Sequence, residues 1–290
     1  MTLQQLIDAA SARLEMAGVS FGHGTANAFD EAAWLVLWRL GLPLDGLDDH
    51  AGDAVGAAQR DAVDSLIAER VTSRRPAAYL TGEAWLQGVP FTVDERVIVP
   101  RSLIAEPLAD GTLDAWLDEH TQDVLDLCCG SAALAVLAAM AWPQVRVDAA
   151  DLSSDALAVA ALNLHRHQLG GRIALHRGDG LAAVAGRRYD LILCNPPYVN
   201  AHSMAALPAE YRAEPALALA GGSDGMDFIR DLLADAPAAL TERGVLVLEI
   251  GHERQHFEAA FPGLNPVWLS TSAGDDQVLL LTRESWAPGA

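Results

Sequence analysis

Residues 126–132 read Asp-Leu-Cys-Cys-Gly-Ser-Ala and predict a tight, polar turn. This turn comes at the end of one of several short apolar segments. Small residues between a strand and a helix let a ligand approach the backbone N–H groups at the helix N-terminus. A pyrophosphate needs close approach at several glycines, as in G-x-G-x-x-G, and only Gly130 is present here. The turn therefore indicates a small-molecule site and disfavours NAD or FAD.

Two aspartates follow the next two apolar segments. Asp151 comes about twenty residues after the first turn, where a carboxylate can accept both ribose hydroxyls of a nucleoside. Asp179, within Gly178-Asp179-Gly180, could accept a hydrogen bond from the exocyclic amine of an adenine. Either carboxylate could instead be a helix N-cap. Their occurrence after successive segments favours a nucleoside site.

A fourth apolar segment ends in Asn195-Pro196-Pro197-Tyr198. Isolated N-P-P turns occur by chance, but at the fourth strand end of a repeating layout the tetrapeptide is specific. All the polar signals in this half of the chain thus follow predicted strands. Ligands of parallel sheets bind beyond the carboxyl ends of the strands, so these residues are expected to share one site.

The elements that must position these residues are repeated βα units from residue 123 onward. Strands are predicted over 123–127, 145–150, 173–176, 189–194 and 244–250, helices over 132–140, 155–168 and 225–240, and closing strands over 267–269 and 277–282. The predicted fold is α/β, a Rossmann-like doubly wound sheet, mostly parallel with the last strand antiparallel.

Residues before this sheet have a different character. Helices are predicted over 2–17, 27–40 and 53–73, with Trp34 and Trp38 four residues apart on a buried face. Between 77 and 100, aromatic and β-branched residues around Gly82 and Gly88 predict a β-hairpin connector. We therefore predict a helical substrate-recognition domain over 1–75, a connector over 76–102 and a catalytic domain over 103–290.

Composition excludes several classes of protein. The chain has 290 residues, 51% of them hydrophobic, which is enough for a core and argues against disorder. Its longest apolar run, residues 132–142, is too short to span a membrane. Three cysteines favour a reducing, cytoplasmic compartment. With 39 acidic against 19 basic side chains, the net charge of −20 disfavours direct nucleic-acid recognition and favours a basic protein partner.

At its place in this layout, Asn195-Pro196-Pro197-Tyr198 resembles the motif of class I S-adenosylmethionine-dependent methyltransferases that act on planar amide or amino nitrogens. The resemblance implies that the Asn195 side-chain oxygen and the Pro196 carbonyl accept the two N–H bonds of the target nitrogen. Pro196 and Pro197 would stiffen these acceptors, and Tyr198 would pack on the flat substrate. Holding the nitrogen in line with the methyl group would lower the barrier mainly by positioning.

The resemblance covers nearly the whole chain. Residues 75–82 and 99–101 are similar to the connector of bacterial protein-glutamine methyltransferases, and residues 207–215 and 221–225 to their substrate-covering loop. Segments 83–85, 94–97 and 100–102 resemble the ribosomal branch of that family more closely than the release-factor branch. The release-factor branch usually has a second proline where this chain has Ser102.

The resemblance implies a cofactor, a partner and a set of site residues. The cofactor is S-adenosyl-L-methionine, and the partner is the basic ribosomal protein L3, either free or in an assembling large subunit. Methylation of peptide-chain release factors is the alternative. The expected catalytic residues are Asn195, Pro196, Pro197 and Tyr198. The expected cofactor-binding residues are Asp126, Cys128, Gly130, Asp151, Asp179, Gly180 and Asn195.

The first turn departs from the family's pattern. The family usually has glycine where this chain has Ala132, and often where it has Cys128, so cofactor affinity is expected to be affected. Cys129 lies at a predicted helix N-terminus, which could activate a thiol. Because no histidine partner is evident nearby and a sulfonium needs no covalent intermediate, we interpret Cys129 as structural.

A second motif, His252-Glu253-Arg254-Gln255-His256, satisfies the H-E-x-x-H pattern of zinc proteases. In those enzymes the motif lies within a longer helix and needs a third ligand downstream. Here it follows a predicted strand directly, in the first turn of a short polar helix. We therefore interpret it as a solvated helix face and expect no metal.

Two rival functions remain open at this level. A DNA adenine methyltransferase faces the same chemical problem, but the charge and the lack of a basic recognition region count against it. A non-catalytic S-adenosylmethionine-binding assembly factor would not need an intact Asn195-Pro196-Pro197-Tyr198. The segment 45–69 carries seven acidic residues against Arg60 alone, so it is either a solvated face or a docking surface for a basic partner.

Overall fold

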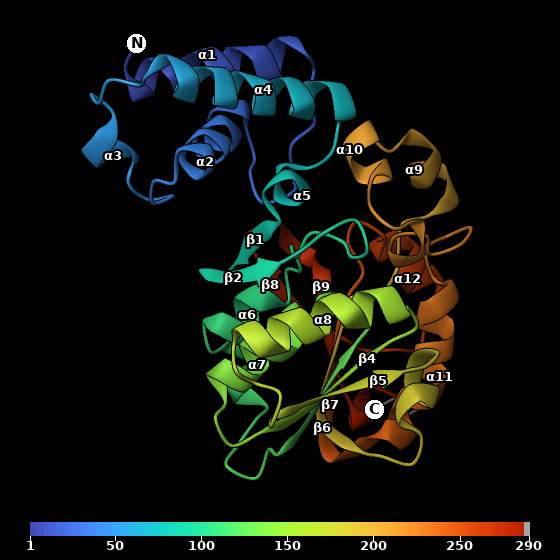
Figure 1. Cartoon of the computed structure of the whole chain (residues 1–290). Coiled ribbons are helices and arrows are strands. Elements are labelled where there is room, and N and C mark those ends of the chain that lie inside the picture. Colours follow the sequence, from blue (N-terminus) through green and yellow to red (C-terminus); the bar gives the residue numbers. More distant parts are fainter. Residues whose placement is uncertain (287–290) are drawn as a thin grey trace. The chain divides into compact units, whose positions relative to one another are not determined.

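The computed structural model describes residues 1–286 and consists of two compact units (Figure 1). The first comprises residues 1–84 together with 207–214, and the second comprises residues 85–206 together with the described residues from 215 onward. The boundaries expected at residues 75 and 102 stay predictions. The assignment of residues 207–214 to the first unit has no counterpart in the sequence patterns.

The first unit is helical, as predicted. Its helices are α1 (Leu3–Met16), α2 (Ala28–Leu40), α3 (Leu47–His50), α4 (Ala57–Ser73), α5 (Ala77–Thr81) and α10 (Ala209–Arg212). The Thr2 side chain caps α1 and the Asn27 side chain caps α2, while Gly41 ends α2 at a left-handed φ of 69°. The long helices α1, α2 and α4 therefore begin and end close to the predicted positions.

One core prediction in this unit is wrong. The buried stripe of α2 follows Ala28, Ala32, Leu35 and Val36, which have helical spacing. Trp38 lies beside this stripe and is 38% exposed. Trp34 is partly buried and packs against the same core. Two aromatic residues four apart were thus a weaker guide to the core than the smaller aliphatic residues of the same helix.

The predicted hairpin connector is confirmed in part. β1 (Glu83–Leu86) and β2 (Val89–Thr92) form a two-stranded sheet. Gln87 and Gly88 join them with φ values of 49° and 74°, and positive φ at both residues is the signature of a type I′ turn. The first part of the predicted hairpin is wrong, because residues 77–81 form α5, which follows Pro76 and ends at Gly82.

The second unit is built on a seven-stranded sheet of order β5-β4-β3-β6-β7-β9-β8. β3 to β7 run parallel, and β9 is antiparallel to both β7 and β8. The strands are β3 (Asp123–Leu127), β4 (Arg146–Asp151), β5 (Ile173–Arg177), β6 (Tyr189–Cys194), β7 (Leu240–Glu249), β8 (Val267–Thr271) and β9 (Gly274–Thr282). The predicted α/β fold with an antiparallel last strand is confirmed.

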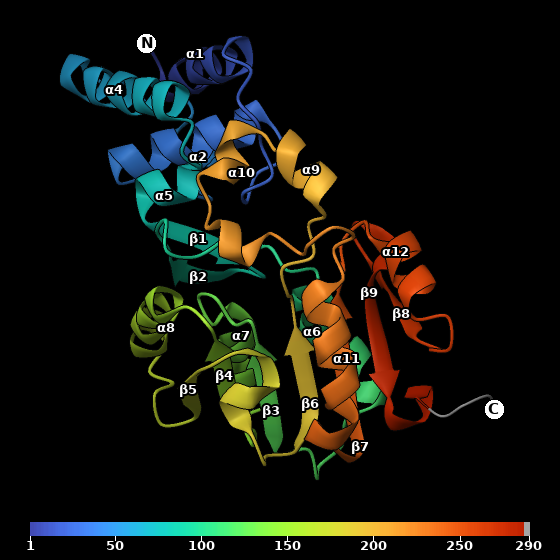
Figure 2. The ribbon, with the colours of Figure 1, turned by 90° about the vertical axis from the view of Figure 1, so that its right-hand side faces the viewer.

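Helices cover both faces of this sheet, because alternate strand residues point to opposite sides. Leu125 and Leu127 of β3 join the buried cluster that includes α11 (Asp227–Ala239), whereas Asp126 bonds to α7 (Ala133–Ala141). Figure 2 shows α11 running alongside β6 and β7. The other helical elements are α6 (Ala105–Ala109), η1 (Thr112–Ala115), α8 (Ser154–Arg166), η2 (Gly180–Val184), α9 (Ala201–Ala206), η3 (Ala216–Ala218), α12 (Arg254–Ala260) and η4 (Arg283–Trp286).

No helix within residues 1–286 combines the length and the apolar character needed to cross a membrane.

Candidate active site

The strand register brings the predicted site residues together. Leu127 of β3 pairs with Ala150 of β4 on one side and with Cys194 of β6 on the other. The carboxyl ends of these strands therefore lie side by side, and a cavity opens just beyond them. Its lining includes six of the seven expected cofactor-binding residues: Cys128, Gly130, Asp151, Asp179, Gly180 and Asn195. The seventh, Asp126, lines a smaller cavity that shares Cys128, Gly130 and Asn195 with the first.

The turn between β3 and α7 has an unusual backbone. Cys128, Gly130 and Ala132 all have left-handed conformations, with φ values of 61°, 53° and 61°. Glycine adopts this conformation without steric cost, whereas residues with a Cβ pay roughly 1–2 kcal/mol. This is the physical reason why glycine suits positions 128 and 132. The Cys129 N–H bonds to the Ala150 carbonyl, which ties the turn to the end of β4.

Asp151 is anchored on both of its carboxylate oxygens. Its Oδ2 accepts from the Gly130 N–H at 2.9 Å and its Oδ1 from the Ser153 N–H at 2.8 Å. Burial raises the pKa of Asp151 above its ordinary value, although the hydrogen bonds from Ser153 and Gly130 oppose this. The N-cap of α8 is Ser153, whose hydroxyl accepts from the Ala156 N–H. Asp151 therefore faces the cavity as a fixed acceptor, and its oxygens keep further lone pairs for a ligand.

Asp179 precedes η2, but its side chain makes no capping hydrogen bond to that element. Asp179 therefore occupies the N-cap position of η2, but its carboxylate does not cap the helix. The side chain is exposed and lies at the cavity, beside Gly180. Gly180 has a φ of 50° and lies close to the ring of Phe228. An exposed carboxylate next to an aromatic ring can recognise a planar base with an exocyclic amine.

Asp126 is fully buried behind the turn, and its Oδ2 accepts from the Ala135 N–H of α7 at 2.8 Å. Burial raises the pKa of Asp126 to about 7, and the nearby Asp151 adds to the rise, although the Ala135 hydrogen bond opposes it. The first role of Asp126 is therefore to hold α7 to β3. Its place on the smaller cavity also puts a second acidic group near Asn195.

Asn195 follows β6 directly and borders both cavities. Among residues 1–286 its side-chain amide has no hydrogen-bonding partner, so its oxygen can serve a ligand. Pro196 is buried, and Pro197 lines the larger cavity. The structure thus presents an available acceptor on a stiff turn that borders both cavities.

Three glycines make room for this turn. A Cβ at Gly221 would lie 2.7 Å from the Tyr198 Cα, and a Cβ at Gly225 would lie 2.3 Å from the Tyr198 carbonyl oxygen. A Cβ at Gly251 would lie 2.5 Å from Cε2 of the Tyr198 ring. Only glycine permits these approaches, since real Cβ contacts are longer. The Tyr198 ring therefore has a fixed place beside Gly251.

Other residues of the larger cavity were missed from the sequence. Leu152 and Phe228 contribute apolar surface, and the segments 96–98 and 215–218 contribute further lining. Leu152 directly follows Asp151, and Phe228 comes three residues after Gly225, so proximity to a recognised motif was the available signal. Residues 96–98 belong to the segment after β2, and their role follows only from the tertiary fold.

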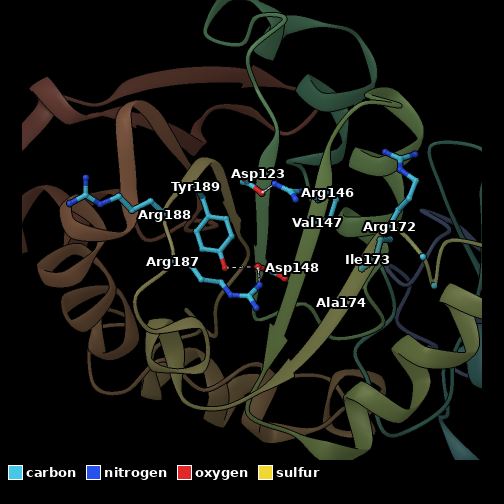
Figure 3. A pocket seen from close by; sticks show the side chains of 12 residues that line it. Asp123, Arg146, Val147, Asp148, Arg172, Ile173, Ala174, Arg187, Arg188 and Tyr189 are labelled. Atoms are coloured by element: carbon cyan, nitrogen blue, oxygen red, sulfur yellow. Dashed lines mark hydrogen bonds and ion pairs between the residues drawn. The ribbon is translucent and has the colours of Figure 1, made fainter.

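A wider groove, of about 500 Å³, lies at the opposite, amino-terminal ends of the strands. Figure 3 shows Tyr189 and Arg187 directed at Asp148, with Arg146 beside Asp123. Asp123 and Asp148 are thus paired with Arg146 and Arg187, while Arg172 donates to backbone carbonyls. Because ligands of parallel sheets bind at the carboxyl ends, we assign the site to the narrower cavity of about 140 Å³ at Asn195.

The structure also explains Cys129 and the motif at residues 252–256, which could have indicated a nucleophile and a zinc site. Burial raises the pKa of the Cys129 thiol above its ordinary value, which disfavours a nucleophilic thiolate. The interpretation of His252–His256 as a solvated face is wrong for Glu253, which is 8% exposed, accepts from Asn200 Nδ2 at 2.6 Å and pairs with His256. Within residues 1–286 no cluster of three His, Cys, Asp or Glu side chains could hold a metal ion.

Comparison with known proteins adds independent support. The methyltransferase small domain family matches residues 111–211. The chain is 58% identical to the ribosomal protein uL3 glutamine methyltransferase of Bordetella pertussis, covering 98% of this chain and 95% of the relative. It is 47% identical to the protein of the same name from Neisseria gonorrhoeae, covering 98% and 95%. The hMettl16 catalytic domain, solved in complex with an RNA hairpin, has a TM-score of 0.51 at 12% identity, covering 78% of this chain and 81% of that one, and supports the fold alone.

Proposed function

The chain belongs to the family of the ribosomal protein uL3 glutamine methyltransferases, and from that membership we propose that it methylates a glutamine side-chain amide of ribosomal protein uL3. The observation that carries the proposal is 58% identity over 98% of the chain to a relative of that name. The chain is accordingly a protein-glutamine methyltransferase. Because the proposed substrate is a ribosomal protein, we expect the enzyme to act in the cytoplasm.

The cofactor of the proposed reaction is S-adenosyl-L-methionine, which supplies an electrophilic methyl group on a sulfonium ion. The residues at the cavity fit such a ligand. The fixed carboxylate of Asp151 suits ribose hydroxyls, and Asp179 with Phe228 suits an adenine ring. Asp126 and Asp151 together make the site acidic, which complements a cationic ligand.

The cavity is small for such a ligand. Its volume of about 140 Å³ is below the ~300–1,000 Å³ that is usual for ligand sites. Its lining includes residues 96–98 and, from the segment 215–218, Pro215, Leu217 and Ala218; neither segment belongs to a strand of the seven-stranded sheet. We expect these segments to move apart when the cofactor binds, while the turn at Asn195 stays in place.

The work of the chain's own residues in the reaction is to bind and orient. An amide nitrogen is a poor nucleophile because its lone pair is delocalised into the carbonyl. In the proposed complex, Asn195 Oδ1 and the Pro196 carbonyl oxygen accept its two N–H bonds, which fixes the nitrogen and favours positive charge there. The methylated nitrogen then sheds a proton readily, so no general base is assigned.

The release-factor alternative is testable against the main proposal. Purified enzyme with labelled S-adenosyl-L-methionine is given uL3, a peptide-chain release factor, or both in competition. We expect label in uL3 with a kcat/KM at least ~10-fold above that for the release factor. Preferential labelling of the release factor would reverse the assignment of substrate without changing the assignment of chemistry.

A further inference from the structure

A buried carboxylate lies next to the proposed catalytic turn and is not explained by the functions above. Glu249 is the last residue of β7 and is 3% exposed. The register pairs Leu248 of β7 with Cys194 of β6, so Glu249 lies in the row of Asn195. A buried charge is retained in a protein only when hydrogen bonds or counter-charges satisfy it. Among the residues that the structure describes, the hydrogen-bonding partners of Glu249 are hydroxyl and backbone N–H groups, and none is a guanidinium.

Glu249 joins two segments that are far apart in the sequence. Its Oε2 accepts from the Ser102 hydroxyl at 2.6 Å and from the Leu103 N–H at 2.9 Å. Its Oε1 accepts from the Tyr198 hydroxyl at 3.1 Å. The carboxylate thus connects the segment before α6 to the last residue of the Asn195–Tyr198 turn. Hydrogen bonds to a charged acceptor are about twice as strong as those between neutral groups.

The ring of Tyr198 is confined as well as bonded. Gly251 lies against its edge, and the backbone of Tyr198 is enclosed by Gly221 and Gly225. The Val199 N–H bonds to the Leu219 carbonyl, and the Gly221 N–H bonds to the Val199 carbonyl. With its hydroxyl fixed at Glu249, Tyr198 holds the carboxyl-terminal end of the turn. β6 holds the other end at Cys194.

We propose that Glu249 is a positioning residue for methyl transfer, acting through Tyr198 to hold the Asn195 and Pro196 acceptors in place. The inference rests on the proposed function. It gives Tyr198 the role of an anchor for the turn, in addition to any contact with a flat substrate. Neither Glu249 nor Tyr198 lines the larger cavity, although Asn195 and Pro197 do, so we expect cofactor affinity to depend on this anchor much less than turnover does.

The central test is the variant Glu249→Gln. Glutamine keeps the size of the side chain but removes the negative charge, and its NH₂ group can meet the Tyr198 hydroxyl only by donating to it, which reverses that hydrogen bond and weakens it. A turn displaced by a fraction of an ångström should lower kcat by about 10- to 100-fold. The Michaelis constant for uL3 and the dissociation constant for S-adenosyl-L-methionine should stay within about two-fold of wild type.

Two further variants separate positioning from a general structural role. Tyr198→Phe should lower kcat to a similar degree, and the double variant with Glu249→Gln should be no worse than the poorer single variant. Glu106→Gln is the matched control, because Glu106 also accepts from a serine N–H and hydroxyl, at Ser272. Its kcat should equal that of wild type. Additive losses in the double variant, or weakened cofactor binding in Glu249→Gln, would overturn the proposal.

Hydrogen exchange tests the same inference without methyl transfer. In Glu249→Gln, amide exchange in peptides covering residues 195–200 should be faster than in wild type, while exchange in β3 stays the same. Unchanged exchange at 195–200, or a kcat above half the wild-type value, contradicts the role of Glu249. If exchange differs between Glu249→Gln and wild type as expected, but wild-type enzyme does not label uL3, the result would instead contradict the proposed function.

Discussion

At the scale of single residues, our proposal gives Asn195 the contact that would distinguish an active methyltransferase from a protein that only binds the cofactor. Its side chain has no partner within residues 1–286 and lies where the two cavities meet. Two other cofactor-binding candidates, Asp126 and Asp151, already accept hydrogen bonds from backbone N–H groups. Loss of the Asn195 side-chain oxygen would therefore remove an acceptor for the reacting nitrogen without breaking a hydrogen bond within the protein.

Asn195→Ala is expected to lower kcat by about 100-fold or more, because a comparable polar contact to a reacting group is worth roughly 3 kcal/mol. Affinity for S-adenosyl-L-methionine, measured by calorimetry, should change little. The exposed Asn265 supplies the control variant, Asn265→Ala, which should behave as wild type. An Asn195→Ala enzyme with more than half the wild-type turnover would remove Asn195 from the reaction.

Asp126 makes stability depend on pH. Its pKa of about 7 in the folded state lies above the ordinary value of 3.8. A raised folded-state pKa gives stability that is fully present below about pH 4 and is lost as the pH rises to about 7. At ~1.4 kcal/mol per pKa unit, the free energy of unfolding should fall by up to about 4 kcal/mol across this range because of this group alone.

Asp126→Asn cannot ionise, and its side-chain oxygen can still accept from the Ala135 N–H. Relative to wild type, the variant should therefore gain stability as the pH rises, when both are compared by urea unfolding at about pH 5 and pH 8. The exposed Asp275→Asn is the control and should follow wild type at both values. If the difference between Asp126→Asn and wild type were the same at both pH values, Asp126 would not titrate as described.

At the scale of elements, the segment 207–214 is held to the helical unit by a buried network of charges. Glu210 is fully buried, forms an ion pair with Arg74 at 2.7 Å, and accepts from the Ser20 N–H at 3.1 Å and from Arg70 at 3.4 Å. Arg70, also fully buried, pairs with Glu31 at 2.8 Å. Burial opposes the charge on Glu210, but the Ser20 N–H and the two guanidinium groups hold its pKa below the ordinary value.

Glu210→Gln should destabilise the helical unit by about 3 kcal/mol, because it leaves the buried Arg70 with less compensating charge. Hydrogen exchange should also become faster in α10. Glu258→Gln is the control, since Glu258 forms an exposed i,i+4 pair with Arg254 that is worth about 0.5 kcal/mol or less. Equal effects of the two variants on urea unfolding would mean that the network at Glu210 contributes no more than a surface pair.

The sequence predicted those elements whose signals are local. Apolar runs located β3 and β6 to the residue, and the turns after them contained the site residues that the register then brought together. Glu249 and Glu253 could not be predicted, because their partners lie about 50 to 150 positions away in the chain. The place of residues 207–214 in the helical unit was missed for the same reason. α5 was missed because five residues are too few to show a helical periodicity of hydrophobic residues.

At the scale of the whole molecule, the acidic charge is concentrated in part on α3, α4 and the residues around them. Asp45, Asp48, Asp49 and Asp53 are all exposed. Within residues 1–286, only Asp53 of these four forms an ion pair, with His50. A basic ribosomal protein would be attracted to such a surface. Attraction of this kind is screened beyond a Debye length of ~8 Å at physiological salt.

Replacing these four aspartates with asparagine should raise the Michaelis constant for uL3 at low salt by about 10-fold, with kcat preserved. Rising salt should reduce the difference from wild type. The matched control neutralises four exposed acidic residues of the catalytic unit, Asp231, Asp235, Glu242 and Asp275. A similar rise in both variants would indicate an effect of net charge, and no rise in the first would show that docking lies elsewhere.

The central claim is that this chain places a methyl group on the side-chain nitrogen of a glutamine in uL3, using the acceptors at Asn195 and Pro196. Tandem mass spectrometry of uL3 after reaction with S-adenosyl-L-methionine tests it most directly. The account predicts the mass of one methyl group on a single glutamine side chain with wild-type enzyme, and none with Asn195→Ala. Methyl groups on lysine, arginine or the N-terminus, or equal modification by both enzymes, would contradict it.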